Sequence, residues 1–594
     1  MMKLPTKTRL LATALLSACL VACGGGGGGG NGNATAGDPG GSTTPPPAPV
    51  PPSEPDPVTP EQASRFLSQA TFGPTSGDIE ALVAGSLEQW FLDELEKSPS
   101  LHLEDVLSFY PDDGNFRDEN NNPLPEVVFR ASDSFWEKAI AGDDQLRQRM
   151  AFALSQILVI SRESTLGQFS HTIAAYMDIL TRGAFGNFRD LIEEVTYSPA
   201  MAVYLTYLRN EKADPTTGRV PDENYAREIL QLFTIGLVQL NPDGTPALDG
   251  QGDPIELYDN DDITGLAKVF TGLSISGINF NAPLRLIPFE GYYEQLDMFD
   301  DFHSLEEKTF LGETIPAGTA GEESIDRALD IIFDHPNIGP FIGRQLIQRF
   351  VTSHPTPAYV ARVADAFDSG RFTLPTGEEV GDGNRGALDA TLAAILFDEE
   401  ARDEDRADDP SYGKLREPVL RFTHWARAFE VNSADASNEI ALKNTGSSEA
   451  LGQNPYGANS VFNFYRPGYI APGTATGDAE LTAPELQIEN AGTVIGYPNF
   501  LTIYALGVAP QFDRNAPQAY LADYAAETAL ADDANALLDH LDLLLTHGRL
   551  ADDTRQTIIA ALDEIPPTRE ELLLARAQLA SVMVMTAPEY IVLR

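Results

Sequence analysis

Cysteine is nearly absent from this chain of 594 residues, because its only two cysteines, Cys19 and Cys23, both lie close to the N-terminus. The sequence after Cys23 therefore excludes disulfides, thiolate metal sites and cysteine nucleophiles. A chain of this length without covalent cross-links has to be stabilised by a core of apolar side chains. It has the material for one, since apolar residues make up 42% of the sequence.

Basic residues are also scarce. The chain has 40 Lys and Arg against 88 Asp and Glu, which gives a formal net charge of −48 at pH 7. A surface of that sign repels nucleic acid and anionic lipid, so we expect neither as a partner. Solubility explains the acidity sufficiently, although it would also suit a high-salt or calcium-rich exterior. Walker-type loops, Gly-x-Ser-x-Gly and His-Glu-x-x-His are missing from the sequence as well.

The apolar run near the N-terminus, Leu10–Ala22, is shorter than the roughly 20 residues that a membrane-spanning helix needs. It follows a basic start and ends on Leu-Val-Ala before Cys23, as in a bacterial lipoprotein signal that is cut before an acylated cysteine. We expect residues 1–22 to be a lipoprotein signal peptide and Cys23 to carry the lipid. The alternatives are a second such box that ends at Cys19 and an ordinary cleaved signal.

A low-complexity segment, residues 23–58, separates this signal from the rest of the chain. It begins with seven consecutive glycines after Cys23 and becomes proline-rich toward Val58. Such a composition cannot bury a core and is typical of a tether that is flexible at first and then stiffer. Because Gly24 is not Asp, the lipoprotein pattern implies delivery to the outer membrane. We therefore expect a protein of the outer membrane or cell surface that contacts the membrane only through its lipid.

Helical periodicity dominates the sequence from Thr59 onward. Thr59–Gln62 has the pattern of a capping box with proline at the first helical position. The stretch Asp78–Leu95 predicts two short helices that break near Gly85. Gln145–Ser161 is apolar nearly all round after its first turn, which is typical of a buried helix.

Strand signals are sparse. The best of them, Gly236–Tyr258, has turn residues between two short apolar stretches and predicts a β-hairpin. We therefore predict a mainly α fold for residues 59–594. It would be a large multi-helical globular domain, or two packed lobes, with a small β-hairpin insertion.

The stretch DENYAREILQLFTIGL, Asp222–Leu237, is the most distinctive part of the sequence. Asp222 is placed to cap a helix and Gly236 to end it. Arg227 and Glu228 neighbour each other between apolar positions. They predict either a cleft in which Glu228 acts as a general base or an ion-pair or cap network that joins helices.

Several stretches resemble one large bacterial family. They are FLSQATFGPT, NYAREILQLFTIGL, DDITGLAKVFTGL, FHSLEEKTFLG, LGQNPYGANSVFNFYRPGY and TAPEYIVLR, and they run in order from Phe66 to Arg594. Together they resemble the family known as domain of unknown function 1800. The resemblance implies no established activity. It implies an exported protein, with a co-encoded exported protein similar to sulfatases and alkaline phosphatases as a possible partner.

The sequence departs from that family at one motif. Many members carry Trp-His-Asn-His after the segment that matches LRQRM, and here Ala153–Gln156 read Ala-Leu-Ser-Gln. If the family's histidines bind a metal or transfer protons, this chain lacks that chemistry. The resemblance therefore argues against an enzymatic role that depends on them.

An acidic cluster, Asp259–Asp262, precedes a second helix, and Asp262 is the expected cap. A calcium loop is the alternative. The EF-hand pattern is broken, however, because Ile263 stands at a ligand position and Thr264 at the position of the glycine. We expect no metal site here and keep Asp262 as a candidate acid–base residue.

The segment FHSLEEKTFLG places His303 and Lys308 in a loop-rich region. We expect both to face a polar cleft shared with the helix that starts at Asn224. There they would bind an anionic group together with Asn224 and Arg227. A single histidine without a second ligand at fixed spacing is weak evidence for a metal.

Aromatic residues alternate with Arg466 in VFNFYRPGY, Val461–Tyr469. Stacked rings there could line a sugar-binding groove, with Arg466 as a binding residue. The alternative is a buried loop anchored by Arg466.

Two functions from different classes follow. The first is a lipid-anchored surface protein that binds an exported protein or a surface polysaccharide. The second is an exported hydrolase of an anionic or glycan substrate, with acid–base residues among Glu228, Asp262 and His303. A pocket that brings these three within hydrogen-bond reach would favour the hydrolase. The sequence indicates no cofactor and does not decide whether the protein is an enzyme.

Overall fold

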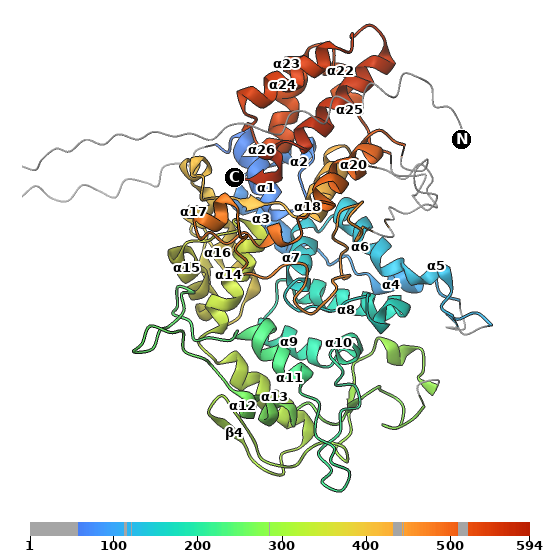
Figure 1. Cartoon of the computed structure of the whole chain (residues 1–594), viewed down its shortest axis with the longest axis vertical. Coiled ribbons are helices and arrows are strands. Elements are labelled where there is room, and N and C mark those ends of the chain that lie inside the picture. The colour runs from blue at the N-terminus through green and yellow to red at the C-terminus, as the bar shows by residue number, and fades with distance from the viewer. Residues whose placement is uncertain are drawn as a thin grey trace, which may run out of the picture. The chain divides into compact units, whose positions relative to one another are not determined.

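Helices carry nearly all of the regular structure in this computed structural model (Figure 1), so the prediction of a mainly α fold is confirmed. The structure describes residues 57–594 apart from 112–115, 120–121, 284–285, 432–441, 443–444 and 509–520. The predicted signal, Cys19, Cys23 and the tether as far as residue 56 lie outside the described residues. Pro57–Arg594 forms one compact unit.

The first half of the described chain is helical, with short 3₁₀ and π turns. Its helices are α1 (Pro60–Ala70), α2 (Ser76–Val83), α3 (Leu87–Glu96), α4 (Leu103–Leu107), α5 (Pro125–Val128), α6 (Arg130–Ala141), α7 (Gln145–Ser155), η1 (Thr165–Gln168), α8 (Ser170–Gly183), α9 (Phe188–Thr196), α10 (Pro199–Tyr204), α11 (Asn224–Glu228), η2 (Ile229–Thr234), α12 (Asn260–Ala267) and η4 (Glu290–Tyr292).

The second half continues in the same way. Its helices are α13 (Gly321–Phe333), α14 (Ile338–Phe350), α15 (Pro357–Ser369), α16 (Leu388–Phe397), α17 (Glu399–Arg402), η5 (Asp405–Asp408), α18 (Pro418–Ala428), α19 (Ala475–Asp478), η6 (Pro484–Gln487), α20 (Thr493–Ala505), α22 (Ala525–Leu530), α23 (Ala534–Leu541), η7 (Asp542–Thr546), α24 (Asp552–Asp563), α25 (Glu570–Met585) and α26 (Pro588–Ile591).

The strands of the described residues form only two-stranded antiparallel sheets. The pairs are β1 (Leu273–Ser274) with β2 (Asp297–Met298), β3 (Lys308–Phe310) with β4 (Glu313–Ile315), β5 (Phe372–Thr373) with β6 (Glu379–Val380), and β7 (Lys414–Leu415) with β8 (Val592–Leu593).

Helix α1 begins where its capping residues predict. The Gln62 backbone N–H donates to Thr59 Oγ1 over 3.2 Å, and the Thr59 N–H donates to Gln62 Oε1 over 3.1 Å. These two bonds satisfy donors that a helix start leaves free. The predicted break near Gly85 is also confirmed, since it separates α2 from α3.

Helix α7 lies at the centre of the fold. Every one of its residues is buried, so the prediction of a buried helix is confirmed. Two arginines, Arg149 of α7 and Arg349 of α14, are among the largest fully buried side chains. Buried arginines are rare unless they are paired. The burial of these two guanidinium groups is therefore an unusual feature of the core.

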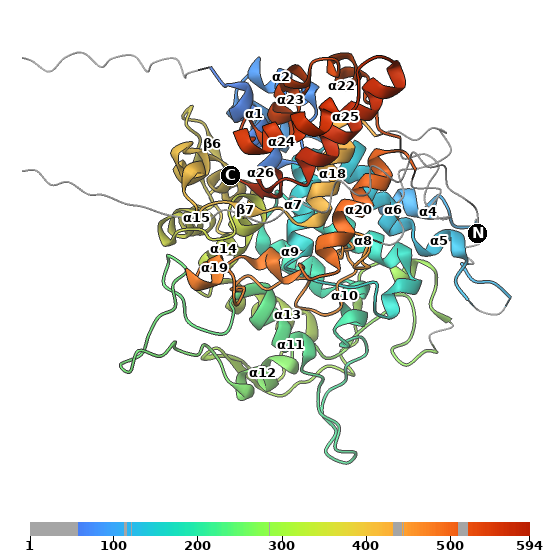
Figure 2. The same ribbon diagram turned by 45° about the horizontal axis from the view of Figure 1, so that its top comes forward.

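The two ends of the described chain pack together. In Figure 2 the C-terminal helices α23–α26 lie beside α1 and α2. Ser64 of α1 donates to Leu543 O over 2.7 Å and lies 2.8 Å from His547 Nδ1. The last strand, β8, pairs with β7. The C-terminal fifty residues thus complete a core that the N-terminal helices begin.

The predicted hairpin at Gly236–Tyr258 is wrong in its topology. Three extended segments replace its two strands, and each donates one backbone hydrogen bond to the next in a closed cycle. Gln239 N donates to Ile255 O, Ile255 N to Ala247 O and Ala247 N to Gln239 O, over 2.7–3.0 Å. These residues are eight apart, and a turn follows each of the first two. The sequence signal of two strands missed the third because its apolar residues are few.

Candidate functional site

The helix that carries the predicted residues Asn224, Arg227 and Glu228 changes its hydrogen-bond pattern directly after Glu228. Helix α11 ends there and the π-helix η2 follows, in which the N–H groups of Ile235 and Gly236 both donate to Leu230 O. Gly236 ends the helix, as predicted, with φ of +79° and so close to Phe341 that a Cβ would lie 2.9 Å from its ring. π-Helical turns are rare and are frequently found at functional sites.

Glu228 is the predicted candidate with the most unusual surroundings. Its side chain is buried, with 7% of the residue exposed, and its Oε2 atom has no hydrogen-bond partner. Burial raises the pKa of Glu228, and the charge of Arg227 opposes the rise. Burial, and to a lesser extent the negative charge of Glu228, raises the pKa of Tyr204 to about 12. The same two causes raise the pKa of Tyr258. A carboxyl group and two phenols thus share a partly desolvated corner.

Replacing Glu228 tests whether its charge costs stability. Because the pKa of Glu228 is higher in the folded than in the unfolded state, the folded protein loses stability as the pH rises from the unfolded pKa through the folded one. We expect Glu228→Gln to raise the Tm at pH 7 and to change it less at pH 4, where the wild-type carboxyl is protonated. Thermal unfolding of both proteins at the two pH values measures this. A lower Tm at pH 7 would contradict the expectation.

Arg227 pairs with Glu223 rather than with Glu228. Its guanidinium lies 3.3 Å from Glu223 Oε2, and 40% of its side chain is exposed. The other oxygen of Glu223 accepts a hydrogen bond from Thr264 Oγ1 of α12 over 2.9 Å. Asn224 lies at the start of the same helix, and its backbone N–H donates to Asp222 Oδ1 over 2.9 Å. The buried Arg227–Glu228 pair is therefore not formed. Arg227 pairs with Glu223 within α11 instead, and the hydrogen bond from Thr264 to Glu223 links α11 to α12.

Asp262 does not cap α12, because Asp259 is the N-cap. Asp262 occupies the third helical position and completes the capping box by accepting from Asp259 N over 2.9 Å. Its second oxygen accepts from Leu311 N, in the turn between β3 and β4, over 2.8 Å. Both carboxylate oxygens therefore hold backbone in place.

The prediction that His303 and Lys308 face a polar cleft shared with the helix that starts at Asn224 is wrong, because both side chains are fully buried. His303 Nδ1 donates to Thr271 O over 2.8 Å, and Nε2 lies 3.3 Å from Ser324 Oγ. Lys308 Nζ donates to Glu306 O over 3.3 Å. Burial lowers the pKa of His303 and lowers that of Lys308 to about 8. The two side chains therefore hold β3 and the loop before it against the rest of the protein.

The structure brings α11, α12 and β3 together as neighbours, so the sequence located one region correctly. It does not bring Glu228, Asp262 and His303 into hydrogen-bond reach of one another. Asp262 and His303 each have other partners, and Glu228 has none. The arrangement expected of an acid–base hydrolase is therefore not formed by these three residues.

Arg466 does not anchor its loop, because its side chain is exposed and lies 4.6 Å over the ring of Phe462. Tyr465 is the buried residue of VFNFYRPGY. Its hydroxyl oxygen lies 3.2 Å from Gln156 Oε1 and 3.2 Å from Glu417 Oε2, and it can donate to either of them. Gln156 is the residue that stands at the last position of the Trp-His-Asn-His motif. Because Tyr465 is buried, its ring does not line the sugar-binding groove that the sequence suggested.

A buried polar network around α7 and α18 is the functional candidate that the sequence analysis missed. Lys414 of β7 forms a buried ion pair with Glu485, with 2.6 Å between Nζ and Oε1. Arg416 donates to Tyr590 O over 3.0 Å and lies 2.8 Å from His547 Nε2. These residues are far apart in sequence, so no local motif marks them. The only available signal was a basic residue inside an otherwise apolar helical pattern, as at Arg149.

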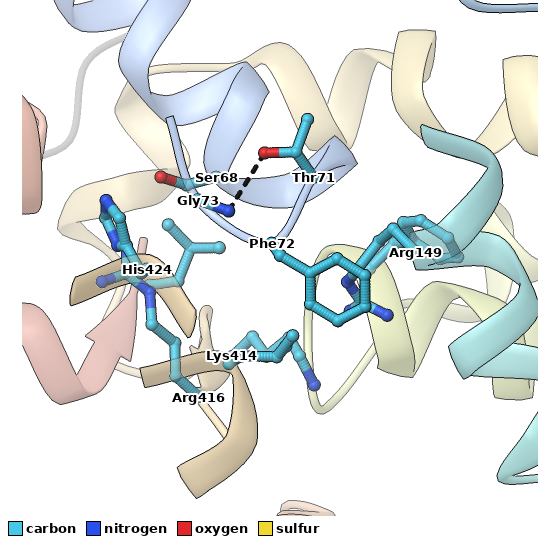
Figure 3. Close-up of a pocket in the computed structure, with 11 residues that line it drawn as sticks. Ser68, Thr71, Phe72, Gly73, Arg149, Lys414, Arg416 and His424 are labelled. Atoms are coloured by element: carbon cyan, nitrogen blue, oxygen red, sulfur yellow. Dashed lines mark hydrogen bonds between the residues drawn. The ribbon is translucent and has the colours of Figure 1, made fainter. Parts of the chain in front are cut away.

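A cavity of about 10 Å³ lies in this network (Figure 3). Arg149, Lys414, Arg416 and His424 surround it, together with Ser68, Thr71 and Gly73 from the end of α1. Burial depresses the pKa of His424 far below its usual value, so its ring is neutral. The cavity is therefore lined by three charged cations, with the apolar rings of Phe72 and Phe350 beside them.

Within the described ranges, no group of three or more His, Cys, Asp or Glu side chains is arranged to hold a metal ion. Over the same ranges, every helix is too short or too polar to cross a membrane.

Comparison with known proteins agrees with the resemblance of the motifs. No curated protein and no solved structure matches the chain. One family model does, the protein of unknown function DUF1800, over residues 65–592, which is most of the chain. The chain therefore belongs to the DUF1800 family.

Proposed function

We propose that this protein is exported, is anchored by a lipid on Cys23 and acts by binding an exported protein partner. The observation that carries the proposal is the separation of the acid–base candidates. Asp262 uses both oxygens to hold backbone, and His303 is buried with both ring nitrogens close to partners. A hydrolase built on Glu228, Asp262 and His303 would need them around one substrate. The binding hypothesis needs no such constellation.

The three-segment meander at residues 237–257 is the surface that we propose for the partner. Leu237, Leu248 and Ile255 on this meander are exposed, with 58% of Leu248 accessible to solvent. Exposed apolar groups within a surface this acidic favour a protein that offers both apolar and basic side chains. A co-encoded exported protein of the sulfatase-like or phosphatase-like kind is the first partner to examine.

Photo-crosslinking from the meander tests this function. A crosslinking amino acid at Leu248, in the lipoprotein expressed in its native cells, should give one discrete protein adduct. Leu237→Asp should reduce that adduct about tenfold, because a charge at the edge of an apolar contact costs more than 1.4 kcal/mol. Mass spectrometry of the adduct identifies the partner.

Two controls separate the parts of the proposal. The same crosslinker at Leu574, an exposed residue of α25, should give no adduct. Cys23→Ser should move the protein out of the membrane fraction. If crosslinking from Leu248 gave a polysaccharide smear instead of a discrete protein adduct, the partner would be a glycan. Equal adducts from Leu248 and Leu574 would contradict the proposal that the meander is the docking surface.

A further inference from the structure

The cluster of buried arginines beside this cavity contains positive charge that the nearest buried carboxylates do not balance. Arg149, Arg349 and Arg416 each expose 3% or less of their surface. Their hydrogen bonds go to carbonyl oxygens and to His547. Arg149 donates to Arg349 O, Arg349 to Gln345 O and Gln156 O, and Arg416 to Leu545 O and Tyr590 O. Carbonyl oxygens solvate a guanidinium group but do not cancel its charge.

Two buried carboxylates lie close to these arginines, and both accept hydrogen bonds from other residues, although Glu417 Oε1 has no partner. Glu485 pairs with Lys414 and accepts from Ser353 Oγ over 2.9 Å. Glu417 accepts at Oε2 from Gln156, Gln453 and Tyr465. Four buried cations, counting Lys414, thus face two carboxylates, which leaves about two positive charges in a region of low dielectric. Burying unbalanced charge is expensive.

Arg149 presents the free donors of this cluster to the cavity. The residue is 1% exposed and lines the cavity, and its Nε and Nη1 atoms are buried without a hydrogen-bond partner. Burial lowers the pKa of Arg149 to about 10, so the guanidinium stays charged at neutral pH. Ser68 also lines the cavity, and its hydroxyl has no partner either. The site therefore combines charge, free N–H and O–H donors, and enclosed space.

We propose that this cavity binds one monatomic anion, chloride, beside Arg149. The volume of about 10 Å³ accommodates a single particle the size of a water molecule or a halide ion. It excludes sulfate, phosphate and carboxylates with their carbon chains. Chloride neutralises part of the excess charge. It also accepts hydrogen bonds from the N–H groups of Arg149 that have no acceptor in the protein. The ion ties α7 to β7 and to the end of α1, the elements that line the cavity.

Thermal unfolding in different anions tests the site in the mature protein. At constant ionic strength, replacing gluconate by chloride or bromide should raise the Tm, with saturation. For a unit of this size the rise is about 2 °C at one hundred times the dissociation constant. In Arg149→Met the halide dependence should disappear. The matched control Arg371→Met removes the same charge from an exposed position and should keep the full dependence.

A measurement on the wild type covers the case in which Arg149→Met fails to fold. Crystals grown in bromide should show an anomalous peak within hydrogen-bond distance of Arg149 Nη1. Chloride titrated into the bromide-loaded protein should displace it and narrow the bromide NMR line. Equal Tm values in gluconate and halide, together with no anomalous peak in the cavity, would overturn the proposal and assign the space to water.

Discussion

Lys414→Met should destabilise the protein by about 4 kcal/mol. The substitution keeps the length of the side chain but leaves Glu485 as a buried carboxylate without its cation. Both side chains of the pair are 1% exposed, and Lys414 Nζ also donates to Gln348 O over 2.9 Å. Breaking one partner of such a pair typically costs 3–5 kcal/mol, because the remaining charge cannot reach water. Denaturant unfolding monitored by tryptophan fluorescence measures the loss.

The double variant Lys414→Met/Glu485→Met shows whether the unpaired charge is the cause. It should recover most of the lost stability, since replacing both charges by apolar groups of similar size is often neutral. Arg371→Met breaks the exposed pair with Glu379 and should cost less than about 1 kcal/mol. If the double variant were as unstable as Lys414→Met, the charge would not be the cause.

Gly265→Ala should cost about 3 kcal/mol and separate α12 from β3. A Cβ atom at position 265 would lie 1.9 Å from Thr309 O and 2.9 Å from Thr309 C. These are backbone atoms, so no side-chain rotation can relieve the overlap, and the helix must move away from the strand. The movement would break the bond from Leu311 N to Asp262 and open the packing around Lys308. Hydrogen exchange at the amides of β3 and β4 reports the separation.

Gly250→Ala is the matched control for this overlap. Gly250 lies in the exposed meander with nothing within 4 Å of the added methyl group. We expect a change below about 0.5 kcal/mol and unaltered exchange in β3. Equal effects of the two substitutions would indicate that alanine acts through the unfolded chain rather than through contact.

The helices were predictable because their signals are local. The capping box at Thr59, the break at Gly85 and the apolar residues of α7 after its first turn each depend on residues within one or two turns. The same holds for Gly236, where the end of a helix requires a positive φ. Sequence separation did not hide the region around α11 and α12, since the two helices are close in sequence and each has a distinctive motif.

The burial of individual polar residues could not be predicted. His303 and Lys308 lie in a segment without helical periodicity, which is typical of an exposed loop, yet tertiary packing covers both completely. Arg466, the expected anchor of its loop, is exposed, whereas its neighbour Tyr465 is buried and donates to Glu417. The cationic cavity joins residues from α1, α7, β7 and α18, a combination that no local pattern reveals.

The pairing of β7 with β8 determines when this chain can fold. Lys414 and Leu415 find their strand partners only at Val592 and Leu593, and Arg416 finds acceptors at Leu545 and Tyr590. While the chain is being synthesised, Lys414 and Arg416 are made before these partners exist. Packing of the core is thus completed only after nearly the whole sequence has been synthesised, because these contacts join residues that are far apart in the chain.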